Sequence, residues 1–577
     1  MKCGRIALAV AIAAAAVGSL SLTVAHGAAH ALGPFTMGTA IGLPTSDGGT
    51  EPRETVVSAG PHPGYYVISN SGGTAFVWES NDGGKTDPWH MTNITGIANQ
   101  TMPTIDVDIV SMPAGSSHPG RLIAIELDFG GINFRTSYSD DGGATWTVST
   151  TTGSPIVTTA PSTTELADQD RPWLATGPND RAYLLFHNLA SGAANHNMYV
   201  ATSNDGGAHF DPPIPVTAPG TQAYLDLQCA DSGGPSNLFV NQSDGRVYAV
   251  FGTRSSVAAG GCGASVTGTF EVNVVAATRV WIATVDAANT EIPAGQLGGW
   301  TQSLAVDDNA SGDIVGMQLA PAAIDSGGNV YVLYPESTTT YPDYDGAAIK
   351  YVHATQSDIV ANPYGLLGPA NQVWHGPVTV APAGGAGHLL PHIVAGGPGQ
   401  IDMAYFEGDE IASPSTSANW FLVVRQSLDA TAASPTISPS QRINYPGSPV
   451  QPKAAYSQWT ASQMMGACNP SGPQAGVLNG LNCNRSTDVW GIALDSNGAL
   501  QVAWPGAPAA SFGCSSPCDE TFVTTQTDGP LIGPGSPGTG VPESPVGTAI
   551  LASAGIAAVA GALYLRRRPR PGEVTAA

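Results

Sequence analysis

Charged side chains are scarce in this sequence. They make up 11% of the 577 residues, against about 25% in an average globular protein, and only four of them are lysines. The formal net charge is −24. Nucleic-acid binding is not expected, because the neutralisation of phosphates needs clustered lysine and arginine. Disorder is not expected either, because a hydrophobic share of 42% is ample for a core.

The sequence also lacks the short motifs of several enzyme classes. It has no nucleophile elbow, no His-Glu-x-x-His, no phosphate-cradling loop and no dinucleotide fingerprint, so no nucleotide partner is predicted. Its main region shows no convincing helical period. Glycine and proline are abundant instead, with 71 and 46 residues. This composition predicts an all-β, turn-rich protein outside the cytoplasm.

The two ends of the chain support export. Lys2 and Arg5 precede an apolar run over 6–22, and small residues follow, so residues 1–31 are predicted to be a signal peptide. Residues 546–565 carry no charge and are followed by an arginine-rich tail, 566–577. Twenty residues span about 30 Å as a helix, and positive charge marks the cytoplasmic side. We therefore expect a single transmembrane helix with a cytoplasmic C-terminus, a Pro/Gly linker over 528–545 and a folded body over 32–527 displayed outside the cell.

The residues before this helix offer an alternative for the tail. Val541 to Pro545, followed by a helix and arginines, resembles the C-terminal sorting tails of the PEP-CTERM type, although Ser544 departs from the family pattern. In those tails the helix is removed during anchoring. Retention and removal of the helix both stay open.

Six cysteines remain when Cys3, which precedes the apolar run, is set aside. An even number in an exported chain predicts disulfides, whereas a zinc site would need paired Cys-x-x-Cys spacing. Pairing between sequence neighbours gives three bridges, although six cysteines allow fifteen connectivities. The predicted bridges are Cys229–Cys262, Cys468–Cys483 and Cys514–Cys518.

One strand–turn–strand unit recurs along the body of the chain. It consists of an apolar strand, a turn with Gly, Asn or Asp, and a second strand, and a third strand follows in most copies. The copies fall at 55–68, 104–125, 172–186, 238–251, 321–334, 391–405 and 490–504. Units of three or four strands at such periods are the blades of a β-propeller. We predict antiparallel four-stranded blades, with seven favoured and six as the alternative.

A sharper motif follows the third strand of the first three blades. It reads Ser-x-Asp-x-Gly-x-Thr-Trp in its complete copy, and its residues are Ser80, Asp82 and Gly84, then Ser139, Asp141, Gly143 and Trp146, then Ser203, Asp205 and Gly207. These are Asp-boxes, and the sequence resembles the sialidase-like BNR-repeat family. The motif is a tight hairpin in which the Asp carboxylate accepts bonds from turn amides. The resemblance implies that these turns are structural and lie opposite the binding face.

Polar residues stand at or just before the first strand of each predicted blade. First strands line the channel of a propeller, so we expect a ring of ligand-binding candidates at the channel face. These candidates are Arg53, Glu54, Asp106, Asp108, Asp170, Arg171, Asn237, Gln318, His392 and Asp488. The Asp-Arg-Pro-Trp opening at 170–173 is the most distinctive of them. A buried pair of Arg171 with Asp170, and a merely satisfied His392, are the structural alternatives.

The family resemblance implies a specific catalytic set. Sialidases of this family bind a substrate carboxylate with three arginines and use a Tyr–Glu nucleophile pair with an Asp as acid/base. The catalytic candidates here are Asp106, Asp170, Arg171, Tyr405 and Glu407. The chain lacks the Arg-Ile-Pro signature of the first arginine. Four arginines could lie near the channel mouth, but no motif selects three of them; they are Arg53, Arg171, Arg254 and Arg425. An aromatic repeated at the end of other second strands favours packing of Tyr405 between blades.

Two acidic stretches, 307–313 and 343–346, hold carboxylates closely enough for calcium. Neither has the twelve-residue loop register, so a solvated acidic turn is favoured and no cofactor is predicted. The function predicted from the sequence is a surface-anchored sialidase-like propeller that binds a glycan or a surface protein through its channel face. The alternative is an exo-α-sialidase-type glycoside hydrolase.

Overall fold

The structure is a computed structural model of the whole chain. It describes residues 35–43, 50–71, 74–92, 104–128, 133–151, 154–155, 169–188, 197–228, 234–253, 277–286, 299–308, 314–315, 320–337, 347–361, 373–385, 387–409, 419–443, 490–506 and 520–533.

The described strands form seven antiparallel sheets and one small ribbon. Blade 1 consists of β3 (Thr50–Val57), β4 (Gly64–Ser71), β5 (Thr74–Ser80) and β6 (His90–Met91). Blade 2 consists of β7 (Thr104–Ser111), β8 (Leu122–Asp128), β9 (Asn133–Ser139) and β10 (Thr147–Val148). The ribbon β11 (Thr150–Thr151) and β12 (Ser154–Pro155) follows it. Blade 3 consists of β13 (Gln169–Thr176), β14 (Ala182–Asn188), β15 (Met198–Ser203) and β16 (Ile214–Pro215).

The second half of the ring repeats this order. Blade 4 consists of β17 (Pro235–Val240), β18 (Val247–Thr253), β19 (Arg279–Val285) and β20 (Thr301–Asp307). Blade 5 consists of β21 (Ile314–Val315), β22 (Ala322–Ile324), β23 (Asn329–Ser337), β24 (Ala348–Thr355) and β25 (His375–Ala381). Blade 6 consists of β26 (His388–Ala395), β27 (Ile401–Gly408), β28 (Trp420–Ser427) and β29 (Gln441–Arg442). Blade 7 consists of β30 (Gly491–Leu494), β31 (Leu500–Gly506) and β32 (Glu520–Asp528), joined by β1 (Thr36–Met37) and β2 (Ile41–Gly42).

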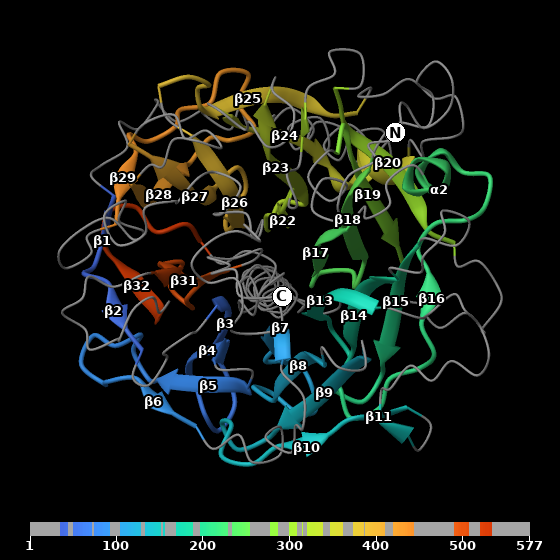
Figure 1. Cartoon of the computed structure of the whole chain (residues 1–577), viewed down its shortest axis with the longest axis vertical. Coiled ribbons are helices and arrows are strands. Elements are labelled where there is room, and N and C mark those ends of the chain that lie inside the picture. Colours follow the sequence, from blue (N-terminus) through green and yellow to red (C-terminus); the bar gives the residue numbers. More distant parts are fainter. Residues whose placement is uncertain are drawn as a thin grey trace, which may run out of the picture.

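The seven sheets are arranged radially around one centre, so the prediction of seven blades is confirmed (Figure 1). Each predicted repeat forms the first two strands of one blade, and the first strands lie nearest the centre. The blades pack through apolar side chains because both faces of each sheet are covered by its neighbours. The largest fully buried side chains are aromatic, including Trp78, Trp281, Trp420 and Trp504.

The two ends of the sequence close the ring. β1 and β2 pair antiparallel with β32, so N-terminal residues supply the outer strand of blade 7 (Figure 1). The segment after β32 also packs on the propeller: Ile532 is fully buried, and its amide donates to the Gly498 carbonyl at 3.2 Å. The predicted linker begins at residue 528, but the globular unit extends to Gly533, whose amide donates to the Gln400 side chain at 3.0 Å.

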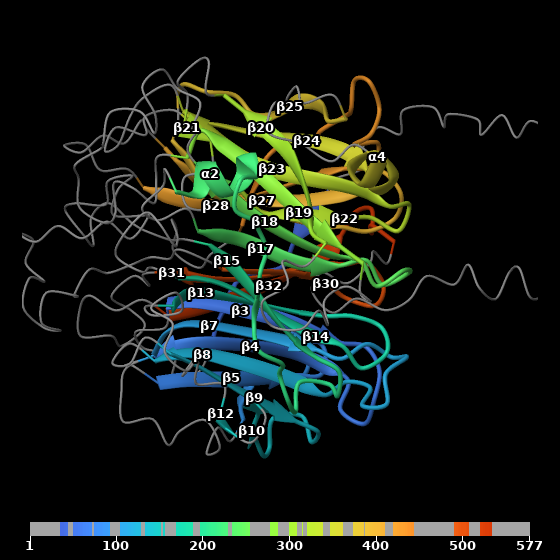
Figure 2. The same cartoon turned by 90° about the vertical axis from the view of Figure 1, so that its right-hand side faces the viewer.

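The propeller has two different faces. We call the face where the first strands begin the mouth face, and the face where they end the turn face. The turns between first and second strands lie on the turn face, as does the short helix α4 (Gln356–Ala361), whereas α2 (Gln222–Leu227) lies on the mouth side (Figure 2). The sequence pattern predicted neither helix. No helix among the described residues is long and apolar enough to cross a membrane.

Several predictions concern residues outside the described ranges. They are the signal peptide, the helix over 546–565, the six cysteines, Gln318 and Asp488. These predictions stay predictions.

Candidate functional site

The first strands begin with a β-bulge, and this bulge builds the site. The pairing register shifts between Thr50 and Arg53, and it shifts at the corresponding place in blades 2, 3, 4 and 6. In blades 1, 3 and 6 the bulge has the sequence X-Pro-Y, and the residue X has a positive φ although it is not glycine: Glu51 at 53°, Arg171 at 54° and Leu390 at 49°. Positive φ costs free energy in residues with a Cβ, and bulges often re-aim side chains beside functional sites.

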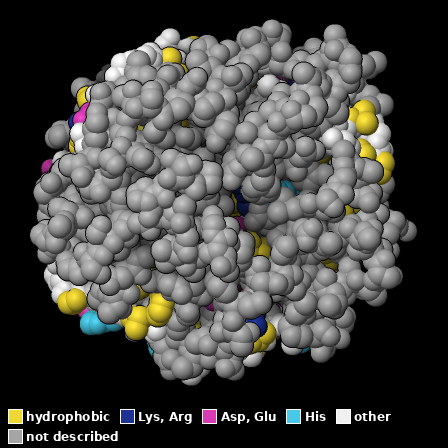
Figure 3. Space-filling model, viewed as in Figure 1, with side chains coloured by type: hydrophobic (Ala, Val, Ile, Leu, Met, Phe, Trp, Pro, Cys, Tyr) yellow, Lys and Arg dark blue, Asp and Glu magenta, His cyan; other side chains and the backbone are white. Residues whose placement is uncertain are grey.

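The residue Y of each bulge lines the central channel. Arg53, Trp173 and His392 occupy this position, and all three line one small cavity of about 30 Å³. The same cavity is lined by Glu54, Asp108, Asn237 and Trp490. The structure therefore brings five of the sequence candidates together, from blades 1, 2, 4 and 6. Basic, acidic and histidine side chains are visible in the hollow near the centre of the mouth face (Figure 3).

Arg53 organises the centre of this cavity. Its Nε donates to Asp108 Oδ1 at 3.1 Å, and its Nη1 donates to the Trp490 carbonyl at 3.4 Å. The guanidinium carbon lies 4.0 Å from the centroid of the Trp173 ring, which is a cation–π contact. One side chain thus connects blades 1, 2, 3 and 7.

Asp108 and Asn237 fasten neighbouring blades to each other. Asp108 Oδ2 accepts from the Leu174 amide of blade 3 at 2.7 Å, and Asn237 donates to the Ala322 carbonyl of blade 5 at 2.5 Å. Such an inter-blade tie was the structural alternative considered for Arg171 with Asp170. The structure shows one between Arg53 and Asp108, across blades 1 and 2.

Burial disfavours the charged forms of Glu54 and His392. Burial raises the pKa of Glu54 well above its usual value, and the charge of Arg53 and the nearby amides of Ala493 and Ala503 offset only part of this. A Cβ on Gly491 would lie 2.9 Å from Glu54 Cγ, so the glycine leaves room for this side chain. Burial, with a smaller contribution from Arg53, lowers the pKa of His392 well below its usual value. Its ring lies 4.3 Å from that of Trp490.

A second, smaller pocket lies beside the channel. Its lining includes Glu51, Arg53, Asp106 and Arg171. Arg171 is 7% exposed and lies against Gly234, where an added Cβ would be 3.1 Å from its Nη1. Asp106 and Arg171 therefore lie near Arg53, as expected of a mouth ring. The side chain of Asp170 lies outside the described part of the chain.

Tyr405 and Glu407 lie away from this cavity, in blade 6. Tyr405 is fully buried in an apolar cluster with Tyr331, Tyr351 and Val423. Burial raises its pKa to about 12, which is opposite to the shift that a nucleophilic phenolate needs. The hydrogen bond from His388 lowers the pKa of Glu407; burial opposes this and Arg442 adds to it. Packing between blades, the alternative favoured by the sequence for Tyr405, fits this environment.

Some of the four candidate arginines lie at the channel, and another lies away from it. Arg53 and Arg171 lie at the mouth, whereas Arg425 donates to the Val380 carbonyl between blades 6 and 5. Arg254 lies outside the described residues. The described residues thus place two of these four arginines at the channel.

The three predicted Ser-x-Asp turns lie on the turn face, after the third strands of blades 1, 2 and 3. Ser139 Oγ accepts from the Gly143 amide at 2.8 Å, and Asp141 accepts from the Thr145 amide at 2.8 Å. Partial burial raises the pKa of Asp141, but bonds from Thr145 and Ser139 lower it below its usual value. The same bonds recur from Ser80, Asp82 and Gly84 and from Ser203, Asp205 and Gly207.

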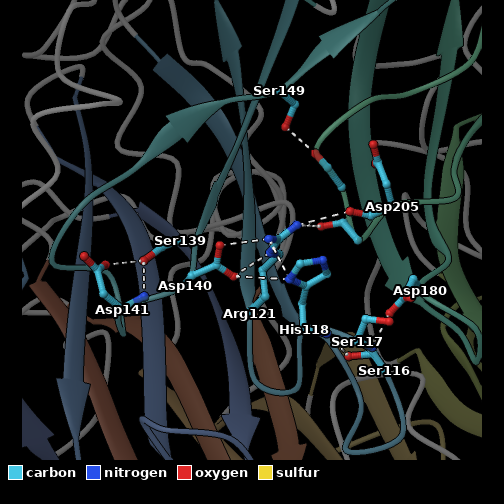
Figure 4. Close-up of polar contacts among 12 residues, drawn as sticks. Ser116, Ser117, His118, Arg121, Ser139, Asp140, Asp141, Ser149, Asp180 and Asp205 are labelled. Carbon is cyan, nitrogen blue, oxygen red and sulfur yellow. Dashed lines mark hydrogen bonds and ion pairs between the residues drawn. The ribbon is translucent and has the colours of Figure 1, made fainter.

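Arg121 connects two of these turns. Its guanidinium donates to Asp140 at 2.6 and 2.8 Å and to the Asp205 carbonyl at 3.1 Å, and its Nη2 lies 2.9 Å from His118 Nδ1 (Figure 4). Trp146 is 7% exposed, as expected for a residue that packs back onto its blade. These turns therefore fasten blades 2 and 3 together.

Sequence reasoning missed several of the residues just described. Glu51, Trp173 and Trp490 were not singled out as channel residues, although the repeated X-Pro-Y triplet at 51–53, 171–173 and 390–392 is a usable signal. A Ser-x-Asp turn in blade 6 was also missed, because Thr436 lies nine positions after Ser427, whereas Thr145 lies six positions after Ser139. The Thr436 amide donates to Asp429 at 2.7 Å.

No protein-family model matches the sequence, and no curated protein matches it. Solved structures with similarity include an α-L-arabinofuranosidase from Fusarium graminearum, at 10% identity and a TM-score of 0.40, covering 85% of this chain and 98% of that one. A PL25 ulvan lyase has 10% identity and a TM-score of 0.44, covering 84% and 95%. An α-L-arabinanase from Penicillium chrysogenum has 12% identity and a TM-score of 0.36, covering 73% and 92%. Because these identities and TM-scores are low, the function has to be argued from the site.

Proposed function

We propose that the protein is an exported, surface-anchored propeller that binds glycans at its channel mouth. The observation that carries this proposal is the channel cavity, which combines Arg53, Glu54, Asp108, Asn237 and His392 with Trp173 and Trp490. Apolar and aromatic walls with a few convergent polar groups are the usual composition of a small-molecule site. Hydroxyl-rich ligands match such a mixed lining.

Anchoring is part of this proposal and is supported by the sequence of the tail. The described chain leaves the propeller at Gly533 on the turn face, because Ile532 and Gly533 bond to the turns that hold Gly498 and Gln400. A helix over 546–565 would therefore hold the turn face toward the membrane and leave the mouth face exposed. Fractionation of cells that express the full chain tests this. Recovery of unprocessed protein entirely from the soluble fraction would contradict the anchor.

We favour binding over sialidase-type hydrolysis, the alternative that the resemblance implies. Tyr405 is buried away from the channel and its phenol is harder to ionise, so the proposed nucleophile pair is poorly placed for attack. The sialidase-like character of the repeats rests on the Ser-x-Asp turns, which lie on the other face.

A glycan array probed with the full-length protein tests the binding function. We expect at least one class of glycan to bind, and Arg53→Met to lower its affinity about tenfold or more, because this substitution removes the charge-assisted bonds at the centre of the cavity. Arg246→Met is the matched control, since Arg246 pairs with Asp286 on the turn face. Equal binding by both variants, or binding of no glycan at all, would reject the proposal.

A further inference from the structure

An aspartate ties neighbouring blades together at two junctions on the turn face. Asp325 begins the first turn of blade 5, and its Oδ2 accepts from the Gly399 amide of blade 6 at 2.7 Å. Asp495 begins the first turn of blade 7, and its Oδ2 accepts from the Tyr65 hydroxyl of blade 1 at 3.1 Å. Gly396 begins the corresponding turn of blade 6, because all three residues donate their amide to the carbonyl four positions ahead at 2.9 Å. Blade 6 therefore has no side chain at the position that could hold blade 7.

The segment after the last strand supplies this missing tie. We call residues 530–533 the strap. The Ile532 amide donates to the Gly498 carbonyl of blade 7 at 3.2 Å, and the Gly533 amide donates to the Gln400 side chain of blade 6 at 3.0 Å. Among the described residues, the first turns of blades 6 and 7 have no hydrogen bond directly to each other. The strap thus connects two turns that are otherwise not bonded.

The strap bonds to both blades a second time through Pro530. Its carbonyl accepts from Gln426 of blade 6 and from Gln526 of blade 7, each at 2.9 Å. The strap therefore makes two hydrogen bonds to each blade. This symmetry is what a clamp across one junction requires.

The groove that receives the strap is shaped by side chains and by their absence. Ile532 is fully buried and shares an apolar cluster with Val394 of blade 6 and Leu494 of blade 7. A Cβ on Gly396 would lie 2.1 Å from the carbonyl oxygen of Gly533. Gly396 does not have a positive φ, so its own backbone does not require glycine. The room left by this glycine is needed for the strap.

The same junction forms part of the channel wall. The cavity is lined by His392 of blade 6 and by Trp490, which directly precedes blade 7. Trp490 Nε1 donates to the Leu390 carbonyl of blade 6 at 3.1 Å, which ties the junction at its mouth end. A change in the spacing of blades 6 and 7 would therefore change the shape of the cavity.

We propose that the strap is a releasable clamp, and that its release opens the junction between blades 6 and 7 from the turn face to the channel. Terminal segments open locally at a lower free energy than the whole fold, and the strap is held by one buried side chain and four hydrogen bonds. The chain continues from the strap into the tail, so a pull on the tail acts on the strap first. The effect on glycan binding rests on the function proposed above, whereas the clamp itself does not.

Thiol labelling of the full-length protein tests the clamp. Val394→Cys places a thiol at the junction of blades 6 and 7, and Val240→Cys places one in the cluster between blades 3 and 4, also near the end of a first strand. The labelling rate of the chain's own thiols is subtracted. Gly396→Ala should speed the labelling of Val394→Cys at least tenfold and leave that of Val240→Cys unchanged. Gly299→Ala is the matched control, because an added Cβ there has nothing within 4 Å.

A second variant releases the strap from its own side. Ile532→Ala removes the buried side chain and should also speed the labelling of Val394→Cys, whereas Leu531→Ala, at an exposed position, should not. Faster deuterium exchange of the amide at position 532 shows that the strap has been released. Release without faster labelling of Val394→Cys would overturn the proposal, and so would the absence of release in both variants. Equal acceleration at Val240→Cys would mean that the whole propeller loosens, which would overturn it as well.

Glycan affinity separates this inference from the proposed function. We expect Gly396→Ala to bind a glycan found on the array about tenfold more weakly, and Gly299→Ala to bind it as the wild type does. Faster labelling with unchanged affinity would overturn the opening toward the channel. Failure of every glycan to bind would reject the proposed function, and the labelling rates would still decide whether the strap is a clamp.

Discussion

The mouth face and the turn face of this propeller are built from the same strands but in opposite ways. On the turn face, the polar groups of the Ser-x-Asp turns are matched: Arg121 donates to Asp140 and to the Asp205 carbonyl, and Asp141 accepts from Thr145. On the mouth face, Glu51 and Arg171 have positive φ, and Glu54 and His392 lack partners among the described residues. Satisfied polar groups stabilise a fold, whereas strained and unsatisfied ones persist where function retains them.

The contrast has exceptions on the turn face, where Arg246 Nε, Gln426 Oε1 and Asp402 Oδ2 also lack a partner among the described residues, and Asp402 has the largest expected consequence. Asp402 is fully buried at the start of β27, where Gln426 donates to its Oδ1 at 2.9 Å and Oδ2 has no partner among the described residues. Burial raises its pKa to about 8, although the bond from Gln426 opposes this. Gln426 also donates to the Pro530 carbonyl at 2.9 Å, so Asp402 lies beneath the C-terminal segment.

The largest expected effect is the pH dependence of stability caused by Asp402. Between an unfolded pKa of about 3.9 and the folded value, the native state binds more protons than the unfolded state, so this group lowers stability as pH rises. Its contribution approaches about 1.4 kcal/mol per pH unit in that window. Asp402→Asn should remove it, so the variant gains stability over the wild type from pH 5 to pH 8. Denaturant unfolding at several pH values measures the difference. Asp180→Asn is the control, because Asp180 lies on an exposed turn and accepts a hydrogen bond from the Ser117 amide. If the stability difference between Asp402→Asn and the wild type did not change with pH, the prediction would be contradicted.

Removal of the buried side chain of the C-terminal segment should come next. Ile532 is fully buried against the turn that holds Gly498, so Ile532→Ala should lower the free energy of unfolding by about 3 kcal/mol. Leu531→Ala next to it is the matched control, because Leu531 is 48% exposed. Thermal unfolding measures both variants. Similar losses would mean that the segment does not belong to the core.

Arg121 tests whether the turn face serves stability alone. Arg121→Met removes its bonds to Asp140 and to the Asp205 carbonyl and should cost about 2 kcal/mol, since Asp140 is half exposed and screened by solvent. Glycan affinity should not change. Arg246→Met, at a more exposed pair on the same face, should cost less than about 1 kcal/mol. If Arg121→Met lost glycan binding but kept its full stability, the turn face would be the binding face, and the comparison between the two faces would be wrong.

On the mouth face, we expect substitution of Arg171 to lower glycan affinity and to leave stability nearly unchanged, which is the opposite of the effect expected at Arg121. Arg171→Lys keeps the charge but loses the planar fork, so glycan affinity should fall about tenfold, or about 1.4 kcal/mol, with little change in stability. Arg181→Lys is the control at the opposite end of the same blade. Titration calorimetry and thermal unfolding together decide the case. Lower stability with unchanged affinity would make Arg171 a structural residue.

The smallest expected effect concerns a single Ser-x-Asp turn. Asp141→Ala removes the acceptor for Thr145 and should cost about 1 kcal/mol, as for a lost helix cap. Asp429→Ala in blade 6 should cost a similar amount, because Thr436 donates to it in the same way. Calorimetric unfolding temperatures measure both. Loss of glycan binding in either variant would place function on the turn face.

Much of the fold was predictable because its signals are local. The strand–turn–strand repeat gave seven blades, since each copy has its own apolar strands and turn residues. The Ser-x-Asp-x-Gly turns were equally visible, because their hydrogen bonds join residues at most seven positions apart. The polar positions at the starts of the first strands predicted the region of the site for the same reason.

Tertiary structure decided which of these residues meet. Arg53, Trp173 and His392 are more than a hundred positions apart in the sequence, and only ring closure by β1, β2 and β32 brings their strands to one channel. The sequence determined that polar side chains stand at these bulges. It could not determine that Arg53 would be matched by Asp108 while Glu54 and His392 were left unpaired, because burial and partnership depend on the neighbouring blades and not on local spacing.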